Sequence, residues 1–222
     1  KIYFFNERTG IAINNVKLIY TTTAGSTWSD VGNSIVDFSI VNNSVVYALD
    51  NNKTIYKIST SNISNGSIIA TVVTTSPDEK LNAISFENDL KGYVAGSGNI
   101  YQTTDGGTAW KPIQTEHPDV VSLFAKTIST ESVLMTIKSD GTAYLGKVLS
   151  NANANPEFTS SSIPLQAKAV DAIFTNNKCF VLFEGGQIVS TENLGTTWIT
   201  QGTAFAGAKA ISISPTLANA VP

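Results

Sequence analysis

The stretch Tyr101-Gln-Thr-Thr-Asp-Gly-Gly-Thr-Ala-Trp110 is the strongest indicator of the fold, because two imperfect repeats of it occur elsewhere in the chain. Counted back from its tryptophan, this copy places Thr103, Asp105 and Gly107 at alternate positions before Trp110. The other two copies keep the same spacing, and their members are Thr21, Thr23, Gly25 and Trp28 in the first and Thr191, Asn193, Gly195 and Trp198 in the last. The repetition indicates a structural unit that the chain uses several times.

The residue types in this unit are those of a braced turn. A short carboxylate, amide or hydroxyl side chain can accept a hydrogen bond from a nearby backbone amide, and glycine reaches backbone angles that strain other residues. The tryptophan then buries a large ring as the next strand begins. We therefore interpret these residues as fold devices. Thr23 and Asn193 stand where Asp105 stands in the middle copy, so neither is an ionised ligand.

The three copies resemble the Asp-box, also called the bacterial neuraminidase repeat, with the pattern Ser-x-Asp-x-Gly-x-Thr-Trp. The resemblance implies a β-propeller in which each box lies between the two outer strands of a blade, away from the ligand-binding face.

A second repeat gives the length of the unit. Apolar strand motifs occur at residues 2–4, 36–38, 84–86, 121–123, 172–174 and 211–213. Every second motif is spaced by 82, 85 and 88 residues, and the tryptophans are spaced by 82 and 88. A pair of unlike blades, each of about 40 residues, explains this period, and four-stranded propeller blades have about this length.

We therefore predict an all-β chain that forms one propeller domain over residues 1–214, with boxes in alternate blades. Its four-stranded blades are expected at about residues 1–32, 33–75, 81–115, 120–161 and 170–203. Residues 208–214 are expected to form the inner strand of a partial sixth blade, and residues 215–222 a tail. Either the chain belongs to a longer propeller or this extra strand packs elsewhere, and the sequence leaves both open.

Composition excludes several classes of function. The net charge is −3, only 14% of residues are charged, and no Lys/Arg run exists, so we expect no nucleic-acid partner. No apolar run has the length of a membrane span. The low charge and the many Asn, Ser and Thr residues favour an extracellular or periplasmic protein whose leader is absent from this chain. The single cysteine, Cys179, is expected to be a buried, inert thiol.

The segment from Ile84 through Tyr93 to the box that ends at Trp110 is similar in sequence to the propellers of photosystem II assembly factors and their bacterial relatives. It is also similar to sialidases, sortilin-type receptors and xyloglucanases, which share a fold and not an activity. The sialidase family holds its substrate with three arginines, and this chain has only Arg8. The arginine-rich patch of the assembly factors is missing too, which argues against a photosynthetic role.

We expect no catalytic residue, metal or cofactor. The only histidine is His117, and no Gly-x-Ser-x-Gly elbow or phosphate loop is present. Eight acidic residues fall in turns or blade links that would share one propeller face. We interpret them as ordinary loop charges, and the alternative is that two of them form the carboxylate pair of a glycoside hydrolase. These residues are Asp30, Asp50, Asp78, Glu79, Glu116, Asp119, Asp140 and Glu184.

The resulting hypothesis is a non-catalytic, extracytoplasmic protein-interaction or scaffold propeller, as a module of a larger surface protein or assembly. Its partner is expected to be a protein or a glycan. The first alternative is a carbohydrate-binding or glycoside-hydrolase-like propeller, and the second is a structural subunit that self-associates through its extra strand. Propeller geometry places the candidate ligand face on the turns between second and third strands, which hold Asn15, Asp50, Asn51, Asn99, Asp140 and Glu184.

Overall fold

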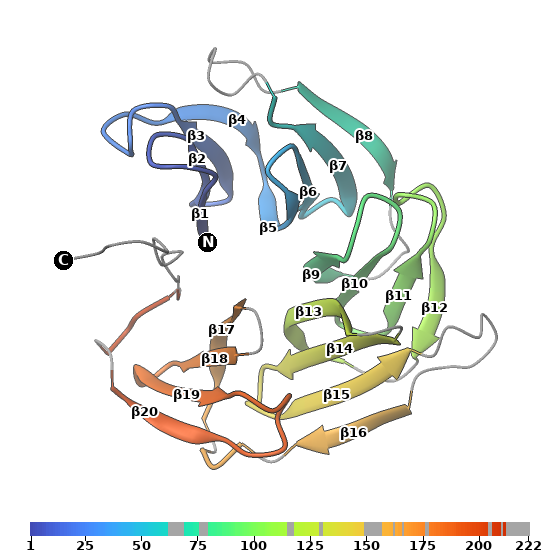
Figure 1. Ribbon diagram of the computed structural model, residues 1–222, viewed down its shortest axis with the longest axis vertical. Coiled ribbons are helices and arrows are strands. Elements are labelled where there is room, and N and C mark those ends of the chain that lie inside the picture. The colour runs from blue at the N-terminus through green and yellow to red at the C-terminus, as the bar shows by residue number, and fades with distance from the viewer. Residues whose placement is uncertain are drawn as a thin grey trace.

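The computed structural model is a β-propeller of five blades arranged in a ring (Figure 1). It describes residues 1–61, 69–75, 80–114, 118–128, 131–148, 157–161, 163–165, 167–175, 178–203, 206–209 and 211. All twenty elements among these residues are strands, and they form five four-stranded antiparallel sheets. The predicted fold class is confirmed.

Each blade takes four consecutive strands, and the first strand of each blade is the innermost. Blade one has β1 (Ile2–Phe4), β2 (Gly10–Asn14), β3 (Lys17–Thr21) and β4 (Ser29–Asn33). Blade two has β5 (Ile35–Asn42), β6 (Val45–Asp50), β7 (Thr54–Ser59) and β8 (Ile69–Thr75). Blade three has β9 (Leu81–Phe86), β10 (Gly92–Gly96), β11 (Ile100–Thr103) and β12 (Lys111–Gln114). Blade four has β13 (Val120–Ile128), β14 (Glu131–Lys138), β15 (Ala143–Val148) and β16 (Glu157–Ser161). Blade five has β17 (Ala169–Thr175), β18 (Lys178–Phe183), β19 (Gln187–Thr191) and β20 (Ile199–Thr203).

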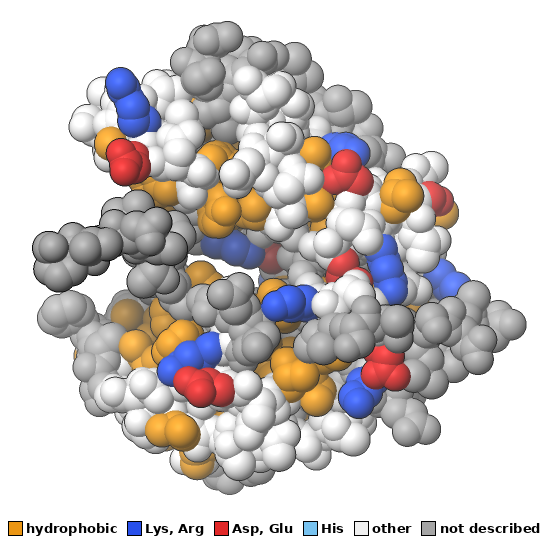
Figure 2. Space-filling view, in the orientation of Figure 1, with side chains coloured by type: hydrophobic (Ala, Val, Ile, Leu, Met, Phe, Trp, Pro, Cys, Tyr) orange, Lys and Arg blue, Asp and Glu red, His pale blue; other side chains and the backbone are white. Residues whose placement is uncertain are grey.

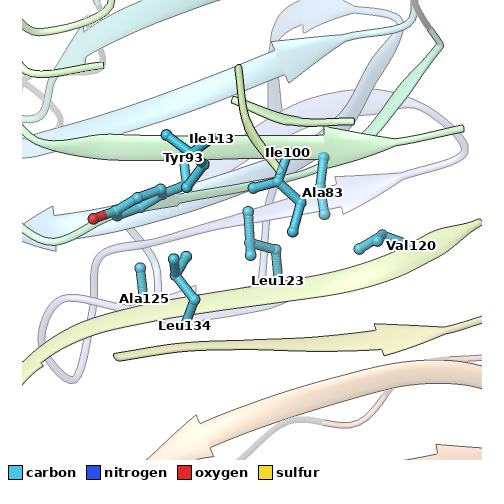
Figure 3. Close-up of a cluster of buried hydrophobic side chains, with 9 residues drawn as sticks. Ala83, Tyr93, Ile100, Ile113, Val120, Leu123, Ala125 and Leu134 are labelled. Atoms are coloured by element: carbon cyan, nitrogen blue, oxygen red, sulfur yellow. The ribbon is translucent and has the colours of Figure 1, made fainter. Parts of the chain in front are cut away.

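The hydrophobic core lies between blades, because each sheet covers its apolar faces with the next sheet. Four clusters of buried side chains join blade one to two, two to three, three to four and four to five. Figure 3 shows the cluster where Tyr93 and Ile100 of blade three meet Leu123 and Leu134 of blade four. Among the described residues, no such cluster joins blade five to blade one.

The three turns that end in a tryptophan lie between the third and fourth strands of blades one, three and five; we call residues 21–28, 103–110 and 191–198 the tryptophan turns. In the middle turn the Thr103 hydroxyl accepts a hydrogen bond from the Gly107 amide at 2.9 Å, and Asp105 Oδ1 accepts one from the Ala109 amide at 2.9 Å. The first turn repeats this pattern with Thr21 and Thr23, and the last with Thr191 and Asn193. A hydroxyl, a carboxylate and an amide thus fill the same bracing position.

Two of these turns are fastened to the first turn of their own blade. The Gly106 amide donates to the Leu90 carbonyl, and the Ala24 amide donates to the Arg8 carbonyl, each at 2.9 Å. The indole of Trp110 meets Phe86 edge to face, with ring centroids 6.2 Å apart, and Trp28 meets Phe4 in the same way at 6.1 Å. Each of these two indoles thus contacts an aromatic ring at the end of the inner strand of its own blade.

Some predicted features fall on residues that the structure does not describe. These are His117, the acids Asp78, Glu79 and Glu116, and the tail 215–222. Of the strand predicted over 208–214, only residues 208, 209 and 211 are described. Cys179 is buried as predicted, and burial raises the pKa of its thiol. Within the described ranges, the structure contains no helix of the length and apolarity that crossing a membrane requires.

Candidate functional site: the central channel

The inner strands of all five blades line a cavity of about 550 Å³ in the centre of the ring. Its walls come from β1, β5, β9, β13 and β17, together with residues next to these strands. Figure 2 shows the molecule hollowed at its centre, with hydrophobic and charged side chains around the hollow. Ligand sites are concave and few per protein, so a cavity to which every blade contributes is the first candidate for a binding site.

Strand register shows which channel residues are equivalent. Asp37, Ser122 and Asp171 each follow a register shift at the start of their inner strand, and they pair with Leu49, Ile137 and Leu182 of the second strand. Lys1 takes this position in blade one, where its carbonyl accepts a hydrogen bond from the Ile13 amide, and Ala83 takes it in blade three. We call these five residues the first layer: Lys1, Asp37, Ala83, Ser122 and Asp171.

The next alternate position of each inner strand forms the second layer. Its members pair with Ile11, Tyr47, Tyr93, Met135 and Phe180 of the second strands. The second layer consists of Tyr3, Ser39, Ser85, Phe124 and Ile173.

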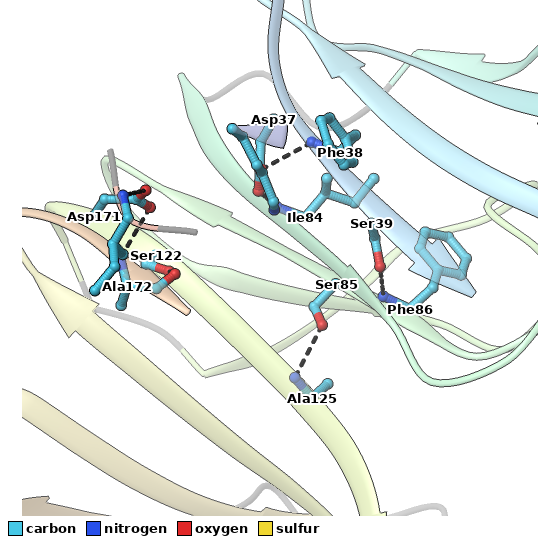
Figure 4. Close-up of polar contacts among 12 residues, drawn as sticks. Asp37, Phe38, Ser39, Ile84, Ser85, Phe86, Ser122, Ala125, Asp171 and Ala172 are labelled. Atoms are coloured by element: carbon cyan, nitrogen blue, oxygen red, sulfur yellow. Dashed lines mark hydrogen bonds and ion pairs between the residues drawn. The ribbon is translucent and has the colours of Figure 1, made fainter. Parts of the chain in front are cut away.

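The acids of the first layer fasten neighbouring inner strands together. Asp37 accepts hydrogen bonds from its own neighbour, the Phe38 amide, at 2.8 Å, and from the Ile84 amide of blade three at 2.9 Å (Figure 4). Its Oδ1 also lies 2.6 Å from the Lys1 ammonium of blade one. Asp37 therefore connects three blades.

Asp171 repeats this arrangement in blade five. Its carboxylate accepts hydrogen bonds from the Ala172 amide at 2.9 Å and from the Ile211 amide at 3.0 Å. Burial raises the pKa of Asp171, and the nearby charge of Asp37 raises it further, against the opposing effect of the backbone amides and of Lys1.

The serines of the second layer make the same kind of link. The Ser39 hydroxyl accepts from the Phe86 amide at 2.8 Å, and the Ser85 hydroxyl accepts from the Ala125 amide at 2.9 Å (Figure 4). Phe124 replaces serine in blade four. Its ring stacks on Phe174 of blade five, with centroids 3.7 Å apart and planes within 4°. Both rings are half-buried and line the cavity, which gives its wall an aromatic surface.

A carboxylate also lines the cavity where the inner strands end. Glu87 accepts hydrogen bonds through Oε2 from the hydroxyls of Thr127 and Ser132, and the Lys91 ammonium donates to Ser132. Its other oxygen, Oε1, is buried and has no hydrogen-bond partner among the residues that the structure places. Burial raises the pKa of the neighbouring Tyr93, and the negative charge of Glu87 adds to this effect.

A second, smaller cavity of about 180 Å³ lies where the inner strands begin. Its charged lining residues are two carboxylates, Asp37 and Asp171, and two ammonium groups, Lys1 and Lys209. Asn82 and Ser122 add neutral polar groups. The channel therefore has a charged end and an aromatic wall.

Five of the six predicted ligand-face residues lie in the turns between second and third strands, whereas Asp50 is the last residue of β6. None of them lines either cavity. Asn51 and Glu184 are exposed, and Asn15 is exposed in a left-handed conformation with φ of 47°.

The other three make local hydrogen bonds. Asp50 is buried and accepts from the Asn52 and Thr54 amides and from the Tyr56 hydroxyl. Asn99 donates to the Tyr101 hydroxyl at 3.1 Å. Asp140 accepts from the Thr142 amide, which lowers the pKa of this carboxyl.

Asp37, Asp171 and Phe124, which the structure brings to the channel, are not among the candidate site residues predicted from the sequence. A signal for the two acids exists, because Asp37 and Asp171 interrupt apolar strand motifs where a charge is costly unless it is bonded. No local pattern distinguishes Phe124 from the many core aromatic residues.

The sequence matches no protein-family model, and a search of curated proteins finds no similar sequence. Solved structures do share the fold. YCF48 bound to a D1 peptide is 16% identical with a TM-score of 0.53, over 90% of this chain and 80% of that one. A Bacteroides thetaiotaomicron protein of unknown function is 10% identical with a TM-score of 0.69, over 95% and 59% of the two chains. The computationally designed protein Ika8 is 12% identical with a TM-score of 0.58, over 96% and 64%. At these identities the likeness is one of fold, and the chain is a β-propeller similar in fold to YCF48.

Proposed function

We propose that this protein is a non-catalytic interaction propeller that binds a polypeptide partner in its central channel. The observation that carries the proposal is the half-buried stacked pair Phe124 and Phe174, which lines a cavity shared by all five blades. Exposed aromatic surface in a concave site is a common anchor for a partner's apolar side chain, since its burial removes water from both surfaces.

The chemistry of the channel acids supports a binding role. Both oxygens of Asp37 and of Asp171 accept hydrogen bonds from backbone amides. A general acid or a nucleophile needs an oxygen aimed at the substrate. These carboxylates are instead occupied in joining inner strands, so we assign them a positioning role. The peptide-bound state of YCF48, a protein of similar fold, agrees with a polypeptide as the ligand.

We propose further that the three tryptophan turns are Asp-boxes and that the protein acts outside the cytoplasm, as a module of a surface protein or assembly. The shared hydrogen-bond pattern of the turns supports the first point. The low fraction of charged residues, 14%, supports the second. Fractionation of the source cells with an antibody to the chain tests the location, and recovery in the cytoplasm alone would contradict it.

Site-specific crosslinking tests the binding role. A photo-reactive phenylalanine analogue replaces Phe124 in one sample and the exposed Ile199 on outer strand β20 in a control sample. After irradiation in an extract of the source organism, we expect one defined adduct with a polypeptide at position 124 and none at position 199. Adducts of equal identity and yield at both positions, or specific binding of glycans alone on an array, would overturn the proposal.

A further inference from the structure

The boundary between blade five and blade one is less covered than the other four. Ile2 of β1 is 37% exposed. Its register equivalents in blades two, three and four are Phe38 and Ile84, at 1% each, and Leu123, at 7%. In those blades the preceding blade covers this position. The exposure of Ile2 shows that blade five does not cover blade one in the same way.

The opposite wall of this boundary is partly uncovered at Phe180, although Leu182 on the same face is buried. Phe180 of β18 pairs with the second-layer residue Ile173 and is half-buried. Its equivalents Ile11, Tyr47, Tyr93 and Met135 are exposed by 2% or less. The Lys178 ammonium lies 5.1 Å from the centre of the Phe180 ring. We call the boundary flanked by Ile2 and Phe180 the seam.

The hydrogen bonds of Asp171 show that the seam binds a backbone amide. In the repeating pattern, the carboxylate of Asp37 bonds the amide of Ile84, the residue after the first layer in the next blade. Ile2 is the corresponding residue of blade one. The Oδ2 atom of Asp171, however, accepts a hydrogen bond from the amide of Ile211, 40 residues along the chain. The backbone at Ile211 thus takes the hydrogen bond that an inner strand of a following blade would take.

A cation accompanies this amide. Lys209, two residues before Ile211, lines the small cavity that also contains Asp37 and Asp171. The seam therefore offers a carboxylate acceptor for a backbone amide, a small polar cavity lined by Asp37 and Asp171, and apolar walls at Ile2 and Phe180.

We propose that the seam is an acceptor site for an extended strand of a polypeptide partner, with a basic residue two positions before an apolar residue. The inference rests on the proposed function and assigns its partner a sequence chemistry. In the free protein, Lys209 and Ile211 of the chain itself occupy this place. A partner strand replaces them, donates its amide to Asp171 and covers the two apolar walls.

The recognition follows from general interaction principles. An extended peptide is held by hydrogen bonds to its backbone and is selected by the sites that receive its side chains. A backbone amide that donates to an ionised carboxylate forms one of the stronger hydrogen bonds in proteins. Without Lys209, the charged lining of the small cavity consists of two carboxylates and the single ammonium of Lys1, and this balance favours a basic over an acidic side chain beside that amide. Burial of Ile2 and Phe180 adds a hydrophobic contribution.

A labelled synthetic peptide with the sequence of residues 208–214 is the direct probe, and fluorescence anisotropy measures its binding to the full chain. We expect the variant Ile211→Pro to bind the peptide roughly ten-fold more tightly than the unaltered chain, because proline has no amide hydrogen to donate to Asp171. The variant Lys209→Glu keeps the backbone donor and weakens the chain's own segment by charge alone, and it is expected to bind the peptide more tightly as well.

Two altered peptides test the chemistry. Replacement of the peptide's lysine by glutamate, or of its first isoleucine by proline, is expected to weaken binding by roughly ten-fold. In the protein, Asp171→Asn is expected to weaken binding of the original peptide. Asp140→Asn, which alters a carboxylate in a turn that lines neither cavity, is the matched control.

The outcomes separate this inference from the proposed function. If neither Ile211→Pro nor Lys209→Glu binds the peptide, or if the charge-reversed peptide binds equally well, the seam is not an acceptor site. Crosslinking of a polypeptide at position 124 would then still support the channel as the binding site. Loss of both results would overturn the proposed function as well.

Discussion

Tyr47 of blade two and Phe86 of blade three stack face to face, with ring centroids 3.6 Å apart and planes within 4°. The Tyr47 hydroxyl extends past the ring and donates to the Asp89 carbonyl at 2.8 Å. Trp110 meets the same Phe86 ring edge to face. One aromatic side chain therefore joins a neighbouring blade to the tryptophan turn of its own blade.

The hydroxyl and the ring of Tyr47 should contribute separately. Tyr47→Phe removes only the hydrogen bond, and we expect it to lower the free energy of unfolding by about 1 kcal/mol. Tyr47→Ala also removes a fully buried ring and should lower it by roughly 3–5 kcal/mol. Urea denaturation of both variants measures the difference. Equal losses in the two variants would show that the stacked ring contributes little.

Gly92 is held as glycine by the Phe86 ring rather than by its backbone angle. A Cβ atom at this position would lie 2.6 Å from that ring, which Tyr47 prevents from moving away. Gly92→Ala is therefore expected to lower the free energy of unfolding by about 2 kcal/mol.

Gly185→Ala is the matched control for Gly92→Ala, since its nearest neighbour is the far end of the flexible Gln187 side chain. We expect this control to change the free energy of unfolding by less than about 0.5 kcal/mol. A comparable loss in both variants would refute the packing explanation.

Asp105 should make stability depend on pH. The amide of Ala109 lowers the pKa of this carboxyl, and the Thr103 hydroxyl adds to the effect. A carboxyl with a lowered pKa in the folded state stabilises the protein above its unfolded pKa, and the contribution is lost as the pH falls through the folded value. The free energy of unfolding of the original protein, relative to Asp105→Asn, should thus fall between about pH 5 and pH 2. Asn193 already fills this position in the last turn, so Asn193→Asp should introduce the same dependence there.

Asp171 should make stability depend on pH in the opposite direction to Asp105. Burial raises the pKa of its carboxyl in the folded state. Its stabilising contribution is therefore complete below the unfolded pKa of about 4 and is lost as the pH rises through the folded value. Relative to Asp171→Asn, the original protein should become less stable as the pH rises from about 4 towards neutrality. Lys1 and Asp37 face this group, so Lys1→Met should strengthen the trend. A difference that does not change with pH would contradict the buried position of Asp171.

Phe124 should serve binding more than folding. Phe124→Ser places in blade four the residue that blades two and three use to bond the next inner strand. We expect partner binding to weaken by roughly ten-fold, because the aromatic wall is lost, while the melting temperature changes little. Ser85→Ala, which removes one of those bonds, should lower the free energy of unfolding by about 1 kcal/mol. Calorimetric melting and the crosslinked partner, once isolated, provide the two readouts.

The all-β propeller could be predicted from local sequence patterns. Thr103, Asp105 and Gly107 brace their turn through hydrogen bonds across four residues or fewer, so the pattern that specifies the turn is local and readable. The recurrence of that turn at each tryptophan, every 82 and 88 residues, then indicated the length of a pair of blades. Asn15 and Asp140 could be placed in turns for the same reason.

The residues of the channel, in contrast, are brought together by contacts between blades. Asp37 meets Ile84 across 47 residues, and Asp171 meets Ile211 across 40. An acid in an apolar strand can bond the backbone of the next blade only where the closure of the propeller brings the two inner strands into register. No residue spacing within one blade encodes this register. The stacking of Phe124 on Phe174 and the exposure of Ile2 at the seam likewise arise only when blades pack side by side, because each sheet finishes its core on its neighbour.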